Sequence, residues 1–128
     1  MIDWNNLFKL RIANSDESFH FHEVVKLIVL MKLLKKYKRD LNIIRVYTEF
    51  PTVNKRRCDV YLENIRTKES HAYEIQKQVS DEWLKNITED YKEWDVPFME
   101  TSDLIIIPLK KLSKNIDELN NQLDEYII

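Results

Sequence analysis

The sequence predicts a domain of mixed α/β class, in which helices flank a central mixed sheet. Its hydrophobic patterns follow the order helix, three strands, helix, strand, helix. An antiparallel run of three strands that leads through a helix to a further strand implies a mixed sheet with helices on both faces. The 128 residues are enough for one core of ordinary size.

We assign the whole chain, 1–128, to one domain, because it contains no internal repeat, low-complexity segment or linker. Residues 17–110 are expected to form an αβββαβ core. Residues 115–128 are expected to add a C-terminal helix. Residues 1–14 carry several large apolar side chains and are expected to form an N-terminal arm or a short helix on the core.

The first helix is predicted over 17–37. Residues 15–18, Ser-Asp-Glu-Ser, offer N-cap candidates and early acids. The middle of this helix, Val24, Val25 and 27–31, is apolar nearly all round. Such a helix is buried on more than one side, which indicates packing on the sheet and on a partner subunit. We therefore expect a homodimer.

The first strand is predicted over 41–50, where apolar and polar side chains alternate until Pro51. Two further runs rich in β-branched and aromatic residues, 56–62 and 73–78, predict a hairpin, with the polar segment 63–71 turning the chain back. The last strand, 103–109, is continuously apolar. This pattern is typical of a strand that helices cover on both faces.

The second helix is predicted from its cap at Ser80 to about Trp94. Trp83, Ile87 and Tyr91 share one face of it with Trp94, which indicates core packing rather than a platform for stacking bases. The last helix runs from about Ile116 to Ile127. Its apolar stripe consists of Ile116, Leu119, Leu123, Tyr126 and Ile127.

Composition excludes several classes of protein. The chain has no Gly, so it lacks a glycine-rich phosphate loop, and we expect no nucleotide cofactor. The lone Cys58 cannot form an internal disulfide, which suits a reducing compartment. No signal-peptide pattern is present, and Lys26 and Lys32 break the longest apolar run. We expect a cytoplasmic protein without a membrane partner. Abundant Ile, Lys and Asn indicate an AT-rich genome of a microbe, or of a virus or plasmid in a microbial host.

The net charge of -2 counts against a passive coat on DNA. It does not count against a metal-dependent nuclease, whose site must carry acids. Basic side chains are concentrated in two blocks. The block within 32–39 lies near the end of a helix, where Lys and Arg are common. The second block is Lys55, Arg56 and Arg57.

The predicted hairpin carries one carboxylate on each strand, Asp59 and Glu74. Strand interiors are depleted in Asp, so an Asp between Cys58 and Val60 indicates a specific role. Alternation places Glu74 and Gln76 on one face of their strand. If both acids point into the same cleft, they form an oxygen-ligand pair suited to a hard divalent cation, Mg²⁺ or Mn²⁺.

The order of elements and these acids resemble the PD-(D/E)XK nuclease superfamily, whose restriction-endonuclease-like core is αβββαβ. Its motif is an Asp on the second strand and Glu-x-Lys on the third, matched here by Asp59 and by residues 74–76, Glu-Ile-Gln. The resemblance covers about 17–110. Gln76 departs from the motif Lys. The runs at 57–60 (Arg-Cys-Asp-Val) and 74–76 look particularly like the CoiA-like branch, beside the archaeal resolvases.

The resemblance implies a DNA endonuclease that hydrolyses phosphodiester bonds with a metal on Asp59 and Glu74. Glu23, in the first helix, is a candidate further metal ligand. Glu49, at the end of the first strand, is a candidate catalytic acid. Phosphates would be held by the basic block Lys55, Arg56 and Arg57, and Gln78 would line the cleft.

Gln76 is expected to orient the attacking water without supplying positive charge. Lys77 should alternate to the other face of the strand, which makes it a poor replacement, whereas Lys55 or a metal ion could substitute. The alternative function is a catalytically degenerate nuclease fold that binds nucleic acid or a protein partner. A third interpretation, a protein-interaction subunit without nucleic acid, follows from the acidic pI of about 5.9.

The histidines lack a zinc signature. His20 and His22 lie about 200° apart on a helix and cannot chelate one metal together. His71 stands alone on a predicted strand.

Overall fold

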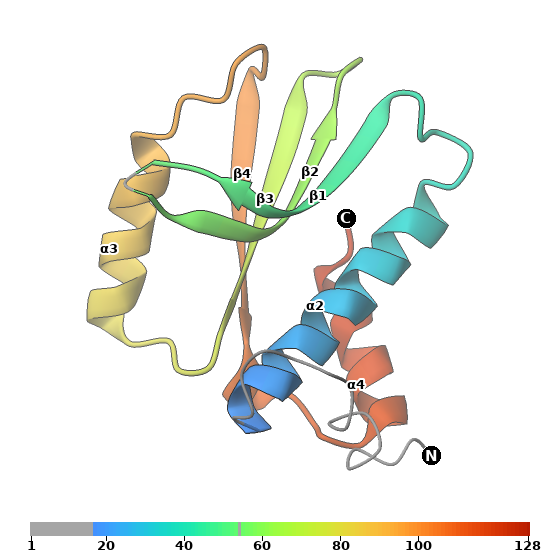
Figure 1. Cartoon of the computed structure of the whole chain (residues 1–128), viewed down its shortest axis with the longest axis vertical. Coiled ribbons are helices and arrows are strands. Elements are labelled where there is room, and N and C mark those ends of the chain that lie inside the picture. Colours follow the sequence, from blue (N-terminus) through green and yellow to red (C-terminus); the bar gives the residue numbers. More distant parts are fainter. Residues whose placement is uncertain (1–16, 54) are drawn as a thin grey trace.

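The computed structural model describes residues 17–53 and 55–128, and it has the mixed α/β class that the sequence predicts (Figure 1). The expected segment 1–14 lies outside the described residues. The described elements follow the predicted order. They are α2 (Glu17–Lys36), β1 (Ile44–Pro51), β2 (Arg57–Asn64), β3 (Glu69–Gln76), α3 (Asp81–Lys92), β4 (Thr101–Pro108) and α4 (Ile116–Leu123), with short 3₁₀ helices η1 (Leu109–Lys111) and η2 (Asp124–Tyr126) on either side of α4.

The four strands form one sheet in the order β1-β2-β3-β4. The first three pair antiparallel, whereas β3 and β4 pair in parallel because α3 carries the chain across between them. The predicted mixed sheet is therefore confirmed. The apolar run of β4 is less buried than expected: Ile107 is fully buried, but Leu104 and Ile106 are half-buried. The reason is that β4 ends the strand order and has only β3 as a neighbour.

Helices α2 and α4 cover one face of the sheet (Figure 1). Val25, Val29 and Leu33 of α2 are fully buried, because residues four apart lie on one side of a helix. They pack against sheet residues and against α4, in a cluster that includes Val60, Tyr73, Ile75, Leu119 and Leu123. Each such side chain contributes about 1.5–3 kcal/mol by leaving water, so this cluster fixes α2 beside β2 and β3.

Helix α3 covers the opposite face (Figure 1). The Ser80 side chain caps it by accepting a hydrogen bond from the Trp83 amide at 3.1 Å, as predicted. Tyr91 and Trp94 pack on a smaller cluster that contains Cys58 and Tyr61. Tyr91, and Trp94 just after the end of α3, therefore belong to the core as predicted, and they hold α3 over the strands that carry the two acids, whereas Trp83 is not part of this cluster.

The β2–β3 hairpin closes in four residues, 65–68, so both strands are longer at this end than predicted. The Asn64 side chain makes the short turn possible by accepting hydrogen bonds from the Arg66 and Thr67 amides. Lys68 completes the turn with φ 65°, a left-handed conformation that glycine usually adopts and that this chain must build without glycine.

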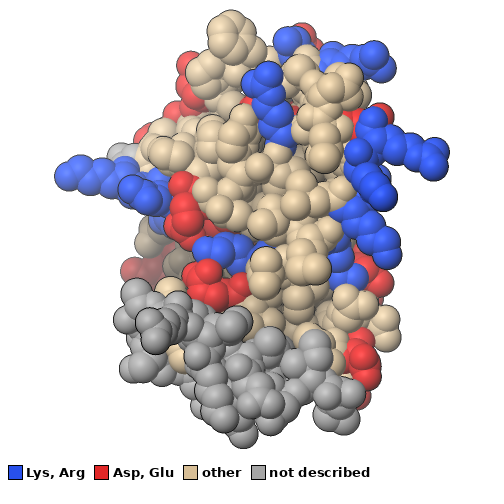
Figure 2. Space-filling view, turned by 45° about the vertical axis from the view of Figure 1, so that its right-hand side comes forward, with Lys and Arg blue, Asp and Glu red and all other residues tan. Residues whose placement is uncertain are grey.

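The outer side of α2 carries exposed apolar side chains: Leu27, Met31 and Leu34 are 51%, 60% and 39% exposed. Figure 2 looks toward the side of the molecule where α2 lies in Figure 1. It shows a wide central area of mostly uncharged residues, with Lys and Arg along its right side and residues of both charges along its left side. The partner subunit expected on this helix stays a prediction. Among residues 17–53 and 55–128, no helix is both long and apolar enough to cross a membrane.

Candidate functional site

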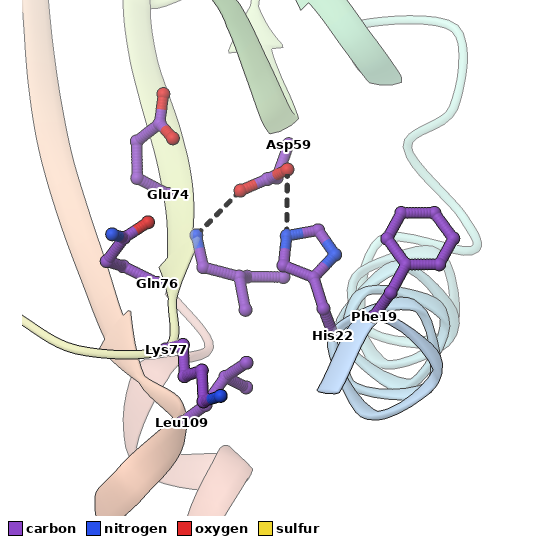
Figure 3. Close-up of a pocket in the computed structure, with 8 residues that line it drawn as sticks. Phe19, His22, Asp59, Glu74, Gln76, Lys77 and Leu109 are labelled. Carbon is purple, nitrogen blue, oxygen red and sulfur yellow. Dashed lines mark hydrogen bonds and ion pairs between the residues drawn. The ribbon is translucent and has the colours of Figure 1, made fainter. Parts of the chain in front are cut away.

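The hairpin that closes tightly at 65–68 opens at its other end. The β2–β3 pairing ends at Val60 and Tyr73, whereas β3 continues to pair with β4 as far as Gln76. Beyond Val60 and Tyr73 the two strands separate, and a pocket of about 340 Å³ lies between them and the start of α2 (Figure 3). The pocket is lined by Phe19, His22, Asp59, Glu74, Ile75, Gln76, Lys77 and Leu109.

Asp59 bridges three elements at the mouth of this opening. Its Oδ2 accepts a hydrogen bond from the Ile75 amide at 2.7 Å, so a side chain replaces the backbone acceptor that regular pairing would supply. Its Oδ1 lies 3.2 Å from Nε2 of His22 on α2 (Figure 3). Asp59 is buried and both of its oxygens are engaged. It therefore fixes β2 to β3 and to α2.

Glu74 is buried on β3, and its Oε1 accepts a hydrogen bond from the Tyr91 hydroxyl at 2.6 Å. Burial raises the pKa of Glu74 from 4.5 to about 7; the Tyr91 hydrogen bond opposes this shift and the negative charge of Asp59 adds to it. Near neutral pH the pocket thus holds one carboxylate that is partly protonated. A cation beside Glu74 would favour the ionised form of this carboxyl.

His22 is a site residue that sequence reasoning missed. Burial lowers the pKa of His22, but the hydrogen bond and charge of Asp59 outweigh this effect, and the pKa lies above its usual 6.5. Its Nδ1 has no hydrogen-bond partner among the described residues, since Glu23 Oε1 is 3.5 Å away. His22 could have been identified from its position on the helix, because it lies one turn before Lys26 on the side of α2 nearest the sheet.

Glu23 and Glu49 do not line the pocket. Both contact Lys26, whose Nζ lies 2.8 Å from Glu23 Oε2 and 2.8 Å from Glu49 Oε1. Glu49 lies in β1 opposite Asp59, between two residue pairs of the β1–β2 pairing, and its φ is 52°. The structure therefore places both acids beside the site, in a network around one lysine, and not with the two carboxylates of the pocket.

Gln76 lines the pocket with Glu74, as strand alternation predicts. Lys77 lines it too, contrary to the expectation that it faces away. The reason is that β3 ends at Gln76, so the alternation of a strand no longer governs Lys77. Gln78 lines an adjoining pocket instead.

None of the basic residues predicted to hold phosphates lines the pocket. Arg56 donates from Nε and Nη2 to Oδ2 of Asp90 at 3.1 and 2.8 Å, which ties the β1–β2 connection to α3. Lys55 and Arg57 are exposed. Arg56 still acts on the site through its charge, which lowers the pKa of Glu74 against the larger effect of burial.

The donors in the pocket are hard oxygen atoms, from the carboxylates of Asp59 and Glu74 and the amide of Gln76. Mg²⁺ accepts one or two carboxylates and keeps several waters, so this donor set fits Mg²⁺ or Mn²⁺. The described part of the chain contains no group of three or more His, Cys, Asp or Glu side chains placed to hold a metal ion. A metal here would therefore complete its coordination with water or a substrate oxygen.

No family model matches the sequence, and neither a curated protein nor a solved structure matches the chain at a significant level. The resemblance to the PD-(D/E)XK superfamily therefore depends on the order of elements and on Asp59, Glu74 and Gln76.

Proposed function

We propose that this chain is a metal-dependent DNA endonuclease of the PD-(D/E)XK type, which hydrolyses phosphodiester bonds. The observation that supports the proposal most directly is that Asp59, Glu74 and Gln76 line one pocket. Two strands bring these residues together only because the hairpin opens at this point. The order of elements around the pocket is also the one that the resemblance implies.

In this proposal, Asp59 and Glu74 would hold Mg²⁺ or Mn²⁺. When bound, such an ion would lower the pKa of a water and neutralise charge on the phosphate. Gln76 accepts and donates hydrogen bonds that orient the water, although its amide adds no charge. His22 lines the same pocket and lies 3.2 Å from Asp59 through its Nε2 atom, so it holds this carboxylate in position.

The test is cleavage of labelled linear duplex, single strand, flap and four-way junction DNA in the presence of Mg²⁺, Mn²⁺ or EDTA. We expect cleavage that requires metal and that falls by at least about 100-fold in Asp59→Asn and in Glu74→Gln. The matched control is Asp95→Asn, which removes an exposed acid away from the pocket and should cut as the wild type does. Absence of cleavage on every substrate, or equal cleavage by all variants, would contradict the proposal.

The second candidate is a catalytically degenerate nuclease fold that binds nucleic acid or a protein partner. Two observations favour it: Gln76 stands where the motif has Lys, and both oxygens of Asp59 already have partners. This candidate predicts binding without cleavage. Affinity for DNA that falls steeply with salt would indicate phosphate contacts, whereas no affinity for DNA would leave a protein partner.

A further inference from the structure

Four lysines surround the segment that joins the end of the sheet to α4. We call this set the basic ridge: Lys77, which follows β3; Lys110 and Lys111, in η1; and Lys114, which precedes α4. None of them belongs to the basic blocks that the sequence singles out. They come from two distant parts of the chain, which the parallel pairing of β3 and β4 brings to one end of the sheet.

Two surface pockets lie along the basic ridge. One, of about 500 Å³, is lined by Lys77, Lys110 and Lys111, and by Gln78. The other, of about 230 Å³, is lined by Lys77, Lys110 and Lys114. Lys77 also lines the pocket that contains Asp59 and Glu74, which we call the carboxylate pocket. In it, Lys77 lies with Leu109 at the end away from Glu74 (Figure 3). The three pockets are therefore neighbours that share one lysine.

Three lysines of the basic ridge, Lys77, Lys110 and Lys111, lack a nearby acid in the part of the chain that the structure describes. Among the residues found to line its two pockets there is no Asp or Glu. Within the described part of the chain, Lys77, Lys110 and Lys111 form no ion pair. Lys114 lies 5.8 Å from the centre of the Phe21 ring. A polyanion placed over these two pockets would therefore meet several ammonium groups of the described residues.

The other sides of the carboxylate pocket differ from the basic ridge. On the α2 side, Lys26 contacts Glu23 and Glu49, so the group carries net negative charge. On the α3 side, Arg56 is paired with Asp90. A DNA strand with a phosphate in the pocket meets unneutralised positive charge in the direction of the basic ridge.

We propose that the basic ridge binds the phosphate backbone of the DNA strand that enters the carboxylate pocket. This inference rests on the proposed function, and it moves the phosphate-binding surface from the block 55–57 to the far end of β3. Lys77 contacts the phosphate nearest the pocket, while Lys110 and Lys111 contact those that follow. Contacts of this kind position the strand and carry no sequence preference.

The test uses a variant in which Lys77, Lys110 and Lys111 are each replaced by Gln, called the ridge variant. Binding of a short labelled DNA duplex is followed by fluorescence anisotropy in EDTA, at about 50 to 200 mM salt. Each lost phosphate contact reduces the slope of log affinity against log salt by about 0.9. We expect the slope of the ridge variant to be shallower by about 2.7 and its affinity to fall by about tenfold or more.

Two controls remove charge elsewhere. Changing Lys35, Lys36 and Lys38 to Gln removes the same charge from exposed positions at the far end of α2. Changing Lys55 and Arg57 to Gln tests the block that the sequence favours. Both control variants should keep the wild-type slope. An unchanged slope in the ridge variant, or an equal loss in the control at α2, would overturn the inference.

Cleavage by the same proteins separates this inference from the proposed function. If the wild type cuts DNA but the ridge variant keeps its salt slope, the basic ridge is not the binding surface and the nuclease proposal stands. If the ridge variant loses binding while the wild type cuts nothing, the surface stands and the chain is a binding module. A wild type that neither binds nor cuts DNA would overturn both.

Discussion

The two ends of the β2–β3 hairpin are built from the same strands but are stabilised by different kinds of contact. At the closed end, the Asn64 side chain accepts hydrogen bonds from two backbone amides at 2.9 and 3.0 Å. These contacts join residues that are close together in the sequence. At the open end, pairing stops after Val60 and Tyr73, and two buried carboxylates take the next positions. Only one of them, Asp59, bonds across the gap between the strands.

The contrast separates folding from function. The interactions of Asn64 and of Asp59 both stabilise the hairpin. Glu74 is different, because a buried carboxyl whose pKa is raised to about 7 by burial opposes folding whenever it ionises. Such a residue persists where it does something besides holding the fold, which is why the open end is the candidate site.

The largest expected effect is the stability of Glu74→Gln. The folded pKa of about 7 exceeds 4.5, so the folded state binds the proton more tightly. The stability that Glu74 contributes is therefore fully present below about pH 4.5 and is lost as pH rises through about 7. The shift is 7 − 4.5 units and corresponds to about 3 kcal/mol. Gln stays neutral, so the variant should be more stable than wild type at pH 8 by up to about 3 kcal/mol and equal to it near pH 4.

The measurement is urea unfolding of both proteins in EDTA across this pH range. Glu100→Gln, at an exposed position, is the matched control and should follow the wild type. A difference between Glu74→Gln and wild type that does not change with pH would show that Glu74 is not held in its protonated form.

The next largest expected effect is the loss of stability that follows a change of Asp59 at the open end. Asp59→Ala leaves the buried Ile75 amide without an acceptor and removes the partner of His22. We expect a loss of about 2 kcal/mol in the free energy of unfolding. Asp59→Asn keeps an oxygen for Ile75 and should lose clearly less. Equal losses in the two variants, measured by urea unfolding at pH 7, would mean that the hydrogen bond to Ile75 is not what closes this end.

The smallest expected effect is a change in stability from substitutions of Lys68 at the closed end. Lys68 adopts φ 65° in the turn, a conformation that strains any residue with a Cβ. Lys68→Gly should relieve this strain and stabilise the protein by about 0.5 kcal/mol, after the greater freedom of Gly in the unfolded chain is counted. Lys68→Ala keeps the Cβ and should bring no gain. Thermal unfolding of both variants tests this, and a gain in Lys68→Ala would rule out backbone strain as the cause.

Periodicity predicted most of the fold, because the strongest patterns here are set by burial. Helix α2 and the capped helix α3 lie where the sequence places them. Strand alternation predicted that Glu74 and Gln76 share a face, and the structure adds Asp59 to the same pocket, which the sequence offered only as a condition. The last helix was predicted less well, since α4 ends at Leu123 and continues as a 3₁₀ turn, although its apolar stripe runs on to Ile127.

The rest of the site depends on contacts between elements, which periodicity does not encode. His22 joins Asp59 only because α2 crosses the open end of the hairpin. Glu23 and Glu49 lie outside the pocket, where both form ion pairs with Lys26. This arrangement depends on three side chains that come from two elements. Lys77 lines the pocket because β3 ends at Gln76, two residues before the end of the predicted run 73–78.

The single thiol of the chain, Cys58, lies next to Asp59 in β2 and is fully buried. Burial raises its pKa to about 12, so almost none of it is thiolate in the closed molecule. An alkylating reagent can therefore react only in the moments when β2 and α3 part. The rate at which this one sulfur atom is labelled would therefore record how often α3 separates from β2.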